Sequence, residues 1–464
     1  METGNGMNLT KECVYNLTGI NQQHHCMQID NTTFTDLSIF HHEEEFSLFH
    51  KLNFTETLGG KEWLIKFFSQ PLADIKKIQD VQAVLQFIGT NNQQWPNSIT
   101  NGTIMVIERY YESQLDDIPS AANQINGLTY KLLHGPDFAL TRYSVGHFAD
   151  FVRGLQQLIQ LFTQAGTPAL LYNFAQRAQD LLKHTTLQKL AALPAGTKLT
   201  AQQTIFFGNY LRYRFKADVL ELIAIYSRWD AWHAMSKAMQ HFNLSLPQFT
   251  TNTQSTIHAK GLYHLLLPKP VAYNVVLEPG KNFLFLTGAN MAGKSTFIKS
   301  VGAAVYLAHI GMGVPAQHMQ LSLFNGILSN INVVDNIVKG ESYFFNEVQR
   351  IKNTISKIND GQKWLVLIDE LFKGTNVQDA MKCSSTVIKG LLKIPNSLFI
   401  LSTHLYEIGE ELKTHPNIIF RYFETSVAND QLSFSYQLKE GISNDRLGYL
   451  ILKREKVIDL LESL

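Results

Sequence analysis

The pattern of apolar and polar positions in the first half of the chain is typical of amphipathic α-helices. One apolar stripe, with spacings of three and four residues, consists of Val145, Phe148, Val152, Leu155, Ile159 and Phe162. A shorter helix is predicted around residues 62–68 and ends before Pro71, because the residue before a proline disfavours helical backbone. Another is predicted from about Ile75 to Ile88, and the polar residues 89–102 predict a loop.

The longest helical stretch runs from Ile205 to Met239, without a proline and with Gly208 as its one weak point. At 1.5 Å per residue this is a helix of roughly 50 Å. A helix of such length usually spans between domains or pairs with a partner. A long member of an ordinary helical bundle explains the pattern equally well, so both interpretations stay open.

The pattern changes after a polar patch at residues 250–254. Near-continuous apolar runs at residues 282–287, 364–368 and 397–402 then alternate with helical segments. Such runs are typical of buried parallel strands, and their alternation with helices indicates an α/β layer.

The predicted organisation is therefore multidomain. It comprises a poorly ordered, Asn/Thr/Gln-rich segment over residues 1–35, an α-helical domain over 36–250 and an α/β domain over 251–464.

Composition mainly excludes classes of protein. The 464 residues carry a net charge of +1, so a nucleic-acid partner would need a local basic surface or a groove shared between subunits. Three scattered cysteines show neither a metal spacing nor a disulfide framework, which favours a reducing compartment. The first thirty residues lack a secretory apolar region, and no apolar run approaches the ~18 residues of a membrane span. We therefore expect a cytoplasmic protein without membrane association.

The strongest chemical signal is FLFLTGANMAGKST, residues 283–296. It fits the phosphate-loop pattern G-x-x-x-x-G-K-[ST] through Gly288, Gly293, Lys294 and Ser295, between an apolar strand and a helix. Glycines let successive backbone N–H groups face a phosphate, and the helix N-terminus adds its positive end. Lys294 would reach the β- and γ-phosphates and the Ser295 hydroxyl would ligate Mg²⁺. The competing interpretation is a glycine-rich turn without a ligand.

Two further motifs follow apolar runs. In WLVLIDE, residues 364–370, two acids stand at the end of a predicted strand, where α/β sheets place ligands. Asp369 suits a Mg²⁺ role and Glu370 suits the base that polarises water, although an acidic strand exit is common without function. In LSTHLYEI, residues 401–408, His404 could sense the γ-phosphate or order the water; a lone histidine at a strand end is more often structural.

Taken together, the motifs resemble those of MutS-family mismatch-repair ATPases. TGANMAGKST is similar to the family's TGPNMGGKST, IDELFKGTNVQDA to IDEIGRGTSTYDG and STHLYEI to ATHYHEL. HIGMGVPAQ resembles YIGSYVPA, and VVDNIVKGESYFFNEV (residues 333–348) resembles GAADDLASGRSTFMVEM. Phe372 and Lys373 depart from the family's Gly-Arg pair, and Tyr343 from a Thr beside its signature serine.

A weaker resemblance extends upstream. Residues 46–78 resemble the opening of the MutS core domain, where a Thr-x-Thr-x-x-Gly run precedes a Pro-Leu pair. Residues 217–249 resemble the helix that returns from the lever to the ATPase. We expect a shortened family member that lacks the mismatch-recognition and connector domains, with the clamp lost or vestigial and the C-terminal helix-turn-helix extension truncated.

The resemblance implies an ABC-related, MutS-type P-loop ATPase that uses ATP and Mg²⁺. The phosphate-loop residues it would use are Gly288, Ala289, Asn290, Met291, Ala292, Gly293, Lys294, Ser295 and Thr296. Ser295 and Asp369 would hold the metal, and Lys294, Glu370 and His404 would be catalytic. Ser342 would reach the ATP of a second subunit, and Asn274 would help to shape the nucleotide pocket.

The function expected from this resemblance is a homodimeric DNA-binding ATPase. ATP hydrolysis would drive conformational change on duplex or branched DNA, without mismatch selectivity, in mismatch repair or recombination-related DNA maintenance. The alternative is a nucleotide-binding dimeric scaffold with little ATP turnover and no mismatch recognition.

Overall fold

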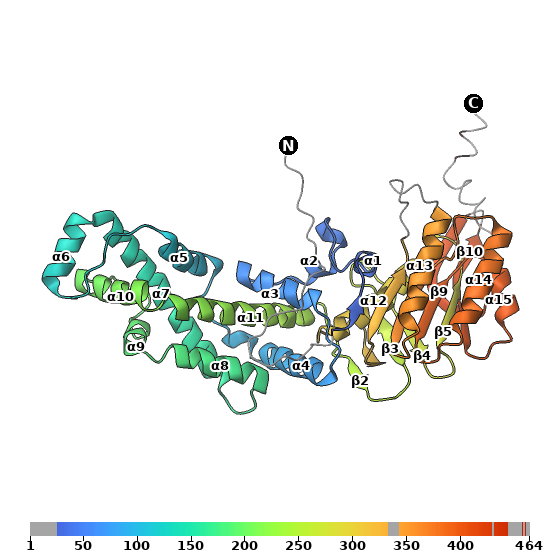
Figure 1. Ribbon diagram of the computed structural model, residues 1–464, viewed down its shortest axis with the longest axis horizontal. Coiled ribbons are helices and arrows are strands. Elements are labelled where there is room, and N and C mark those ends of the chain that lie inside the picture. Colours follow the sequence, from blue (N-terminus) through green and yellow to red (C-terminus); the bar gives the residue numbers. More distant parts are fainter. Residues whose placement is uncertain (1–25, 333–342, 429–430, 444–456, 458–459, 461–464) are drawn as a thin grey trace.

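The chain forms an elongated helical arm joined to an α/β body (Figure 1). The structure is a computed structural model that describes residues 26–332, 343–428, 431–443, 457 and 460. It confirms the predicted order of a helical region followed by alternating strands and helices. None of the helices that it describes is both long enough and apolar enough to cross a membrane.

The helical region is one connected bundle. Its helices are α2 (Leu48–Leu52), α3 (Leu58–Ser69), α4 (Ile75–Thr90), α5 (Asn101–Glu112), α6 (Gln124–Leu133), α7 (Gly135–Phe162), α8 (Ala169–Leu181), α9 (Thr185–Ala191), α10 (Ala201–Tyr213) and α11 (Lys216–His241). The predicted apolar stripe lies on α7, where all six of its side chains are buried. α6 and α10 lie at the far end of the arm, and α11 runs back toward the body (Figure 1).

The prediction of one helix from Ile205 to Met239 is wrong, because α10 ends at Tyr213 and α11 begins at Lys216. The chain turns at Phe215, whose side chain is wholly buried and whose ring stacks on that of Tyr210. Arg212 donates to the backbone carbonyls of Tyr110 and Ser113 at the end of α5. These tertiary contacts outweigh the local helical preference that the sequence shows. α11 is the central helix of the bundle and also leads to the α/β body.

A buried carboxylate joins α11 to the start of α3. Asp230 accepts hydrogen bonds from the Thr57 hydroxyl at 2.6 Å, the Thr57 amide at 2.9 Å and the Glu56 amide at 3.1 Å. Thr57 is also the N-cap of α3 and accepts from the Gly60 amide. A Cβ at Gly60 would lie 2.0 Å from an Asp230 oxygen, so the Thr-x-Thr-x-x-Gly run is the shape that fits this carboxylate.

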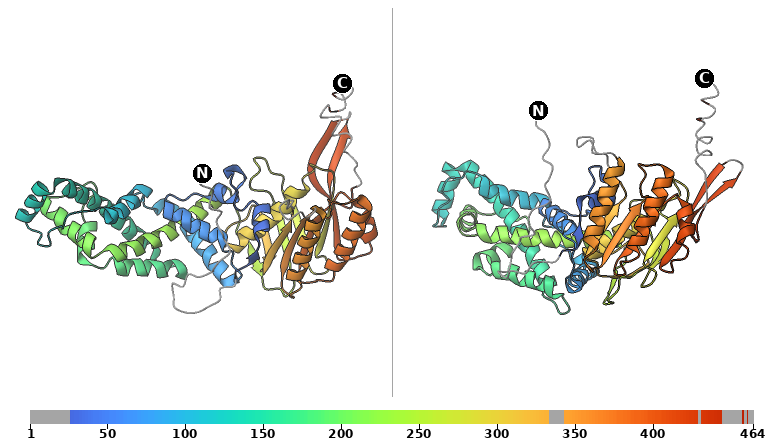
Figure 2. Two further views of the ribbon diagram at one scale, coloured as in Figure 1. Left: turned by 45° about the horizontal axis from the view of Figure 1, so that its top comes forward. Right: turned by 45° about the vertical axis from the view of Figure 1, so that its right-hand side comes forward.

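The α/β body contains two sheets. The larger has the order β1 (Gln28–Ile29), β7 (Gly326–Asn330), β8 (Trp364–Asp369), β9 (Leu398–Ser402), β5 (Phe283–Thr287), β10 (Ile418–Ala428) and β11 (Gln431–Glu440). Its described strands pair in parallel except at the β10–β11 hairpin, which projects from the body in Figure 2. The smaller sheet has the order β2 (Gln248–Thr250), β6 (His318–Ser322), β3 (Ile257–Leu262) and β4 (Tyr273–Leu277).

The pleat of the larger sheet separates two apolar layers. Leu284 and Leu286 of β5 point to the layer that holds α12 (Lys294–His309) and is continuous with the helical arm. Phe283 and Phe285 point to the opposite layer, formed by α13 (Tyr343–Ile358), α14 (Val377–Leu391) and α15 (Tyr406–Leu412). Because both faces are covered, the strands have the near-continuous apolar runs seen in the sequence.

The N-terminal part of the described chain belongs to the body rather than to the arm. Residues 26–35 were expected to be poorly ordered, but they form β1 and most of α1 (Asn31–Asp36), and β1 pairs in parallel with β7. β2, which precedes the predicted boundary at residue 250, pairs with β6. The body therefore collects segments from both sides of the helical region.

α12 links the body to the first helices of the arm. His309, at its last turn, lies with Nδ1 2.7 Å from the Leu72 carbonyl oxygen and accepts from the Phe324 amide through Nε2. Burial lowers the pKa of His309 to about 4, so the ring is neutral at pH 7 and makes both bonds as one tautomer. The Tyr306 hydroxyl donates to the Phe68 carbonyl at the end of α3. The phosphate-loop helix is thus anchored in the arm at its far end.

Candidate active site

The three predicted motifs meet at one edge of the larger sheet. β8, β9 and β5 are parallel neighbours, so their carboxyl ends lie together, with Asp369 opposite Ser402. Ligands of open α/β sheets bind at this edge. The strand order therefore brings together side chains that are far apart in the sequence.

The loop after β5 has the backbone of a phosphate cradle. Gly288 and Gly293 adopt φ of 139° and 106°, in the left-handed region that favours glycine. A Cβ at Gly288 would lie 3.2 Å from the Phe423 carbonyl oxygen, so the loop packs closely on β10. α12 begins at Lys294, and its N-terminus faces the loop, the arrangement that binds phosphate in other proteins.

Lys294 is buried and bonded to its own loop. Its Nζ donates to the carbonyl oxygens of Gly288 at 2.8 Å and Ala289 at 3.0 Å. Burial lowers the pKa of Lys294, whereas the carboxylates of Glu370 and Asp369 act in the opposite direction. The ammonium therefore lies where incoming phosphate oxygens can replace two carbonyl acceptors.

The Asp369 carboxylate accepts hydrogen bonds from two hydroxyl groups that lie on different elements. Ser295 at the start of α12 donates to Oδ2, and Ser402 at the end of β9 donates to Oδ1. A hydroxyl and a carboxylate in contact form the all-oxygen donor set that Mg²⁺ prefers. Ser295 and Asp369 therefore fit the predicted metal role.

Two basic side chains lie beside Glu370. His404 Nδ1 lies 3.5 Å and Lys373 Nζ 3.6 Å from its Oε2. Burial opposes ionisation, but the hydrogen bond from His404 and the charges of Lys373, His404 and Lys294 outweigh it and lower the pKa to about 2. Glu370 also has φ of +64°, a strained backbone for a side chain of its size. Its carboxylate is thus ionised at neutral pH and held in a costly position.

A hollow of about 590 Å³ opens above the phosphate loop, a volume suited to a nucleotide. It is lined by Leu267, Lys269, Val271, Tyr273, Asn290, Met291, Gly293, Lys294, Ser295, Thr296, Glu370 and Tyr436. Ala289 and Ala292 are buried in the loop. His404 and Asp369 border the hollow through their bonds to Glu370 and Ser295.

Asn274, predicted to shape the nucleotide pocket, does not line this hollow. The side-chain oxygen of Asn274 accepts from the Gly261 amide at 3.0 Å, in the β3–β4 hairpin. Its neighbour Tyr273 lines the hollow instead, because alternate residues of a strand point to opposite faces. Ser342 lies outside the described residues.

Several lining residues were missed by sequence reasoning. Leu267, Lys269 and Val271 come from the segment before β4, and Tyr436 comes from β11, where its φ is +53°. Nothing in the sequence marks Tyr436, because its approach depends on β11 joining the sheet beside β10. Glu347 was also missed; its buried carboxylate accepts from the backbone amides of Lys373 and Gly374.

Comparison with known proteins agrees with this geometry. A family model described as MutS domain V matches residues 284–458. Human "MutS protein homolog 4" is 31% identical over 211 residues, 43% of this chain and 22% of that protein. "DNA mismatch repair protein MSH3" of Vanderwaltozyma polyspora is 29% identical over 261 residues, 53% of this chain and 25% of that protein.

A bacterial protein is also similar to part of this chain. "DNA mismatch repair protein MutS" of Petrotoga mobilis is 26% identical over 228 residues, 48% of this chain and 28% of that protein. The matched part thus spans less than a third of each of these relatives. The domain V match and these relatives make the chain similar to MutS-family mismatch repair proteins, and the three motifs that carry the similarity meet at one sheet edge.

Proposed function

We propose that this chain is an ABC-related P-loop ATPase of the MutS type, which binds ATP with Mg²⁺ in the hollow above Gly288–Thr296 and hydrolyses it. The observation that carries the proposal is the meeting of Lys294, Ser295, Asp369 and Glu370 at the carboxyl ends of β5 and β8. The similarity of residues 284–458 to MutS domain V, and of the chain to a MutS protein, supports it.

The roles of the residues follow from their charges and positions. Lys294 would exchange its two carbonyl acceptors for β- and γ-phosphate oxygens and neutralise charge that develops on them. Glu370 would orient and polarise the attacking water. A carboxylate with a pKa of about 2 is a weak proton acceptor, and the negative phosphates of ATP would raise its pKa toward a useful value. His404 would hold the Glu370 carboxylate in place.

Magnesium fits the oxygen donors that the chain supplies. When bound, Mg²⁺ neutralises charge on the phosphate oxygens. The Ser295 hydroxyl and the Asp369 carboxylate would hold it, and Ser402 would orient Asp369 from the opposite side.

The competing proposal is a dimeric scaffold that binds ATP without useful turnover. The cationic surroundings of Glu370 favour the enzyme, because a scaffold gains nothing from a strained, ionised carboxylate beside the phosphate loop.

A pair of lysine variants tests the ATP site. Lys294→Ala should abolish Mg²⁺-dependent phosphate release and weaken ATP binding at least tenfold, about 1.4 kcal/mol. Lys281→Ala makes the same chemical change at an exposed turn two residues before β5 and should behave like the parent. Equal ATP binding by the two variants would overturn the proposal.

We also propose that two copies assemble into a homodimer with composite ATP sites. By resemblance, Ser342 of one copy would complete the site of the other, and closed twofold pairing would give two such sites. Turnover per chain should then rise with protein concentration. Turnover that is independent of concentration in a strictly monomeric protein would refute the dimer.

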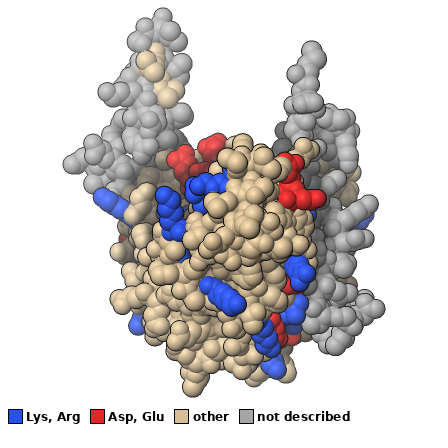
Figure 3. All heavy atoms as spheres, turned by 90° about the vertical axis from the view of Figure 1, so that its left-hand side faces the viewer, with Lys and Arg blue, Asp and Glu red and all other residues tan. Residues whose placement is uncertain are grey.

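DNA binding is proposed from the relatives' names, two of which include DNA mismatch repair. Arg212, Arg214 and Lys216, at the break between α10 and α11, are candidate phosphate contacts. Arg212 is occupied by Tyr110 and Ser113, whereas Arg214 and Lys216 are exposed. The end of the arm shows scattered Lys and Arg among mostly uncharged residues (Figure 3). We therefore expect salt-sensitive binding of modest affinity, with branched DNA bound better than linear duplex.

The absence of mismatch selectivity stays a prediction. A mismatch is detected through its low cost of kinking around an inserted side chain. Competition at fixed salt between a homoduplex and the same duplex with one mismatch tests it. A tenfold preference for the mismatch would contradict the prediction.

A further inference from the structure

The first turns of α13 hold the backbone that follows Glu370. The buried carboxylate of Glu347 accepts from the Lys373 amide at 3.0 Å and from the Gly374 amide at 3.1 Å. A Cβ at Gly374 would lie 2.7 Å from the Phe344 amide nitrogen, so loop and helix are in direct contact. The rings of Phe344 and Phe372 also pack, with centroids 5.7 Å apart.

This loop needs support because its backbone is strained. Glu370 and Phe372 have φ of +64° and +60°, although neither is a glycine. Such conformations cost about 1–3 kcal/mol each and persist only when surrounding contacts impose them. The two amides that Glu347 holds come directly after Phe372, so its carboxylate limits how far the loop can relax and how far Glu370 can move.

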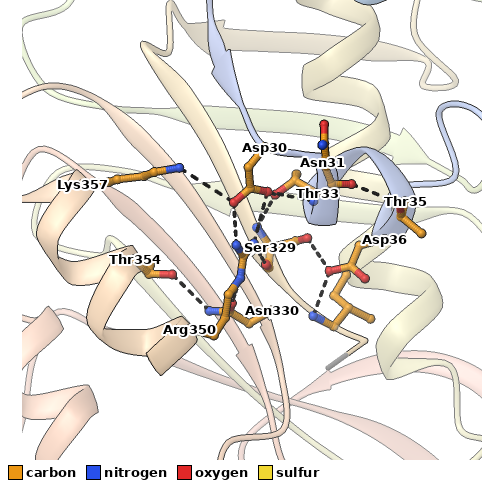
Figure 4. A network of polar contacts seen from close by, with 11 residues as sticks. Asp30, Asn31, Thr33, Thr35, Asp36, Ser329, Asn330, Arg350, Thr354 and Lys357 are labelled. Atoms are coloured by element: carbon orange, nitrogen blue, oxygen red, sulfur yellow. Dashed lines mark hydrogen bonds and ion pairs between the residues drawn. The ribbon is translucent and has the colours of Figure 1, made fainter. Parts of the chain in front are cut away.

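One turn further along α13, Arg350 faces the N-terminal segment. Its guanidinium donates to both Asp30 oxygens, at 2.5 and 3.2 Å, and to Asn330 Oδ1 at 2.6 Å (Figure 4). Asp30 is the N-cap of α1 and accepts from the Thr33 amide at 2.9 Å. Burial opposes ionisation of Asp30, but the bonds from Arg350 and Thr33 lower its pKa.

The same short helix is fixed to β7 at its other end. Asp36 is buried and accepts from the Ser329 hydroxyl at 2.5 Å (Figure 4). It also accepts from the Ile331 amide at 3.0 Å and the Asn332 amide at 3.1 Å. The next residue, Leu37, packs against α12, where a Cβ at Gly302 would lie 2.5 Å from it. α1 and its N-cap therefore link α13 to β7 and α12, and the chain continues from α1 into the helical arm.

We propose that Glu347 is a positioning residue for Glu370, and that the Asp30–Arg350 pair ties this positioning to the segment that begins the helical arm. The proposal rests on the proposed ATPase function. The contacts run from Asp30 to Arg350, along about one turn of α13 to Glu347, and through the amides of residues 373 and 374 to the loop of Glu370. A shift of the base by about 1 Å is enough to lower a rate about 100-fold.

The variant that tests the proposal is Glu347→Gln, which keeps the shape but leaves one acceptor oxygen for two amides. We expect kcat to fall at least tenfold while the affinity for Mg²⁺-ATP stays within twofold, because the phosphate loop is untouched. Glu347→Asp should recover part of the rate. Glu410→Gln, on the exposed face of α15, makes the same chemical change as a control and should match the parent.

Asp30→Asn extends the test to the N-terminal segment and remains informative if Glu347→Gln folds poorly. It should lower kcat with ATP affinity retained. In the double variant with Glu347→Gln the two effects should be non-additive, since both act through α13. Unchanged kcat in both single variants, or parallel loss of kcat, ATP affinity and thermal stability, would overturn the positioning role.

Hydrogen exchange separates this proposal from the ATPase itself. The amides of Lys373 and Gly374 should exchange at least tenfold faster in Glu347→Gln than in the parent, whether or not ATP is hydrolysed. If the parental protein does not hydrolyse ATP, the ATPase proposal is refuted and the positioning role is not. Unchanged exchange at these two amides would refute the positioning role alone.

Discussion

Two carboxylates, buried Asp230 and half-buried Glu370, show how differently the two halves of the molecule use the same chemical group. Asp230, in the joint between α3 and α11, is enclosed by the Thr57 hydroxyl and backbone amides, and no cation among the residues that the structure describes contributes to its pKa shift. Glu370, at the edge of the sheet, has His404 and Lys373 beside it and faces a hollow. Burial raises the pKa of Asp230, whereas the hydrogen bond from His404 and the charges of nearby basic groups lower that of Glu370 to about 2.

The difference separates a structural acid from a functional one. Asp230 accepts hydrogen bonds from donors that would otherwise be unpaired. Gly60 leaves room for its carboxylate, and the Thr57 hydroxyl donates to it. Glu370 satisfies few donors and is held in a strained backbone by groups around it. We therefore expect that removing Asp230 harms folding, and that removing the charge of Glu370 harms chemistry.

The largest expected effect on stability is that of Asp230→Ala. It leaves the hydroxyl and amide of Thr57 and the amide of Glu56 without their acceptor, at a cost of about 3 kcal/mol. Urea denaturation monitored by circular dichroism measures the loss. Asp218→Ala, in the first turn of the same helix, should cost about 0.5 kcal/mol. Equal losses of stability in the two variants would show that the hydrogen bonds of Asp230 do not stabilise the joint between α3 and α11.

A smaller effect follows from pH. The pKa of Glu370 is lowered from 4.5 to about 2, so its stabilising contribution is present above pH 4.5 and is lost as pH falls toward 2. Asp230 has a raised pKa, so its ionisation costs stability as pH rises above its ordinary value of 3.8. Acidification should therefore act on the two groups with opposite sign.

Urea denaturation at steps between pH 4.5 and 3 checks this sign. Glu370→Gln should lose about 1 kcal/mol less stability than the parent over that interval. Asp230→Asn should lose more than the parent, because it lacks a group whose protonation favours folding. Identical pH dependence in the parent and in Glu370→Gln would mean that cations do not stabilise Glu370.

Much of the site could be predicted from the sequence because its motifs are contiguous. The phosphate loop and the acids after β8 are recognisable as strings of residues, and a parallel sheet then places them at one edge. Tyr436, Glu347 and Asp30 could not be predicted, because their contacts depend on β11 joining β10, on α13 packing against a loop and on β1 pairing with β7. The break before α11 was missed for a similar reason, since distant contacts at Tyr110 and Ser113 turn the chain.

The ATPase proposal depends most directly on Glu370. The decisive measurement is phosphate release from Mg²⁺-ATP by Glu370→Gln, together with ATP binding by the same variant and Glu410→Gln as the control. We expect Glu370→Gln to bind ATP within a few-fold of the parental affinity and to release phosphate about 100-fold more slowly or less. Phosphate release by Glu370→Gln at the parental rate would contradict the assignment of Glu370 as the residue that activates water.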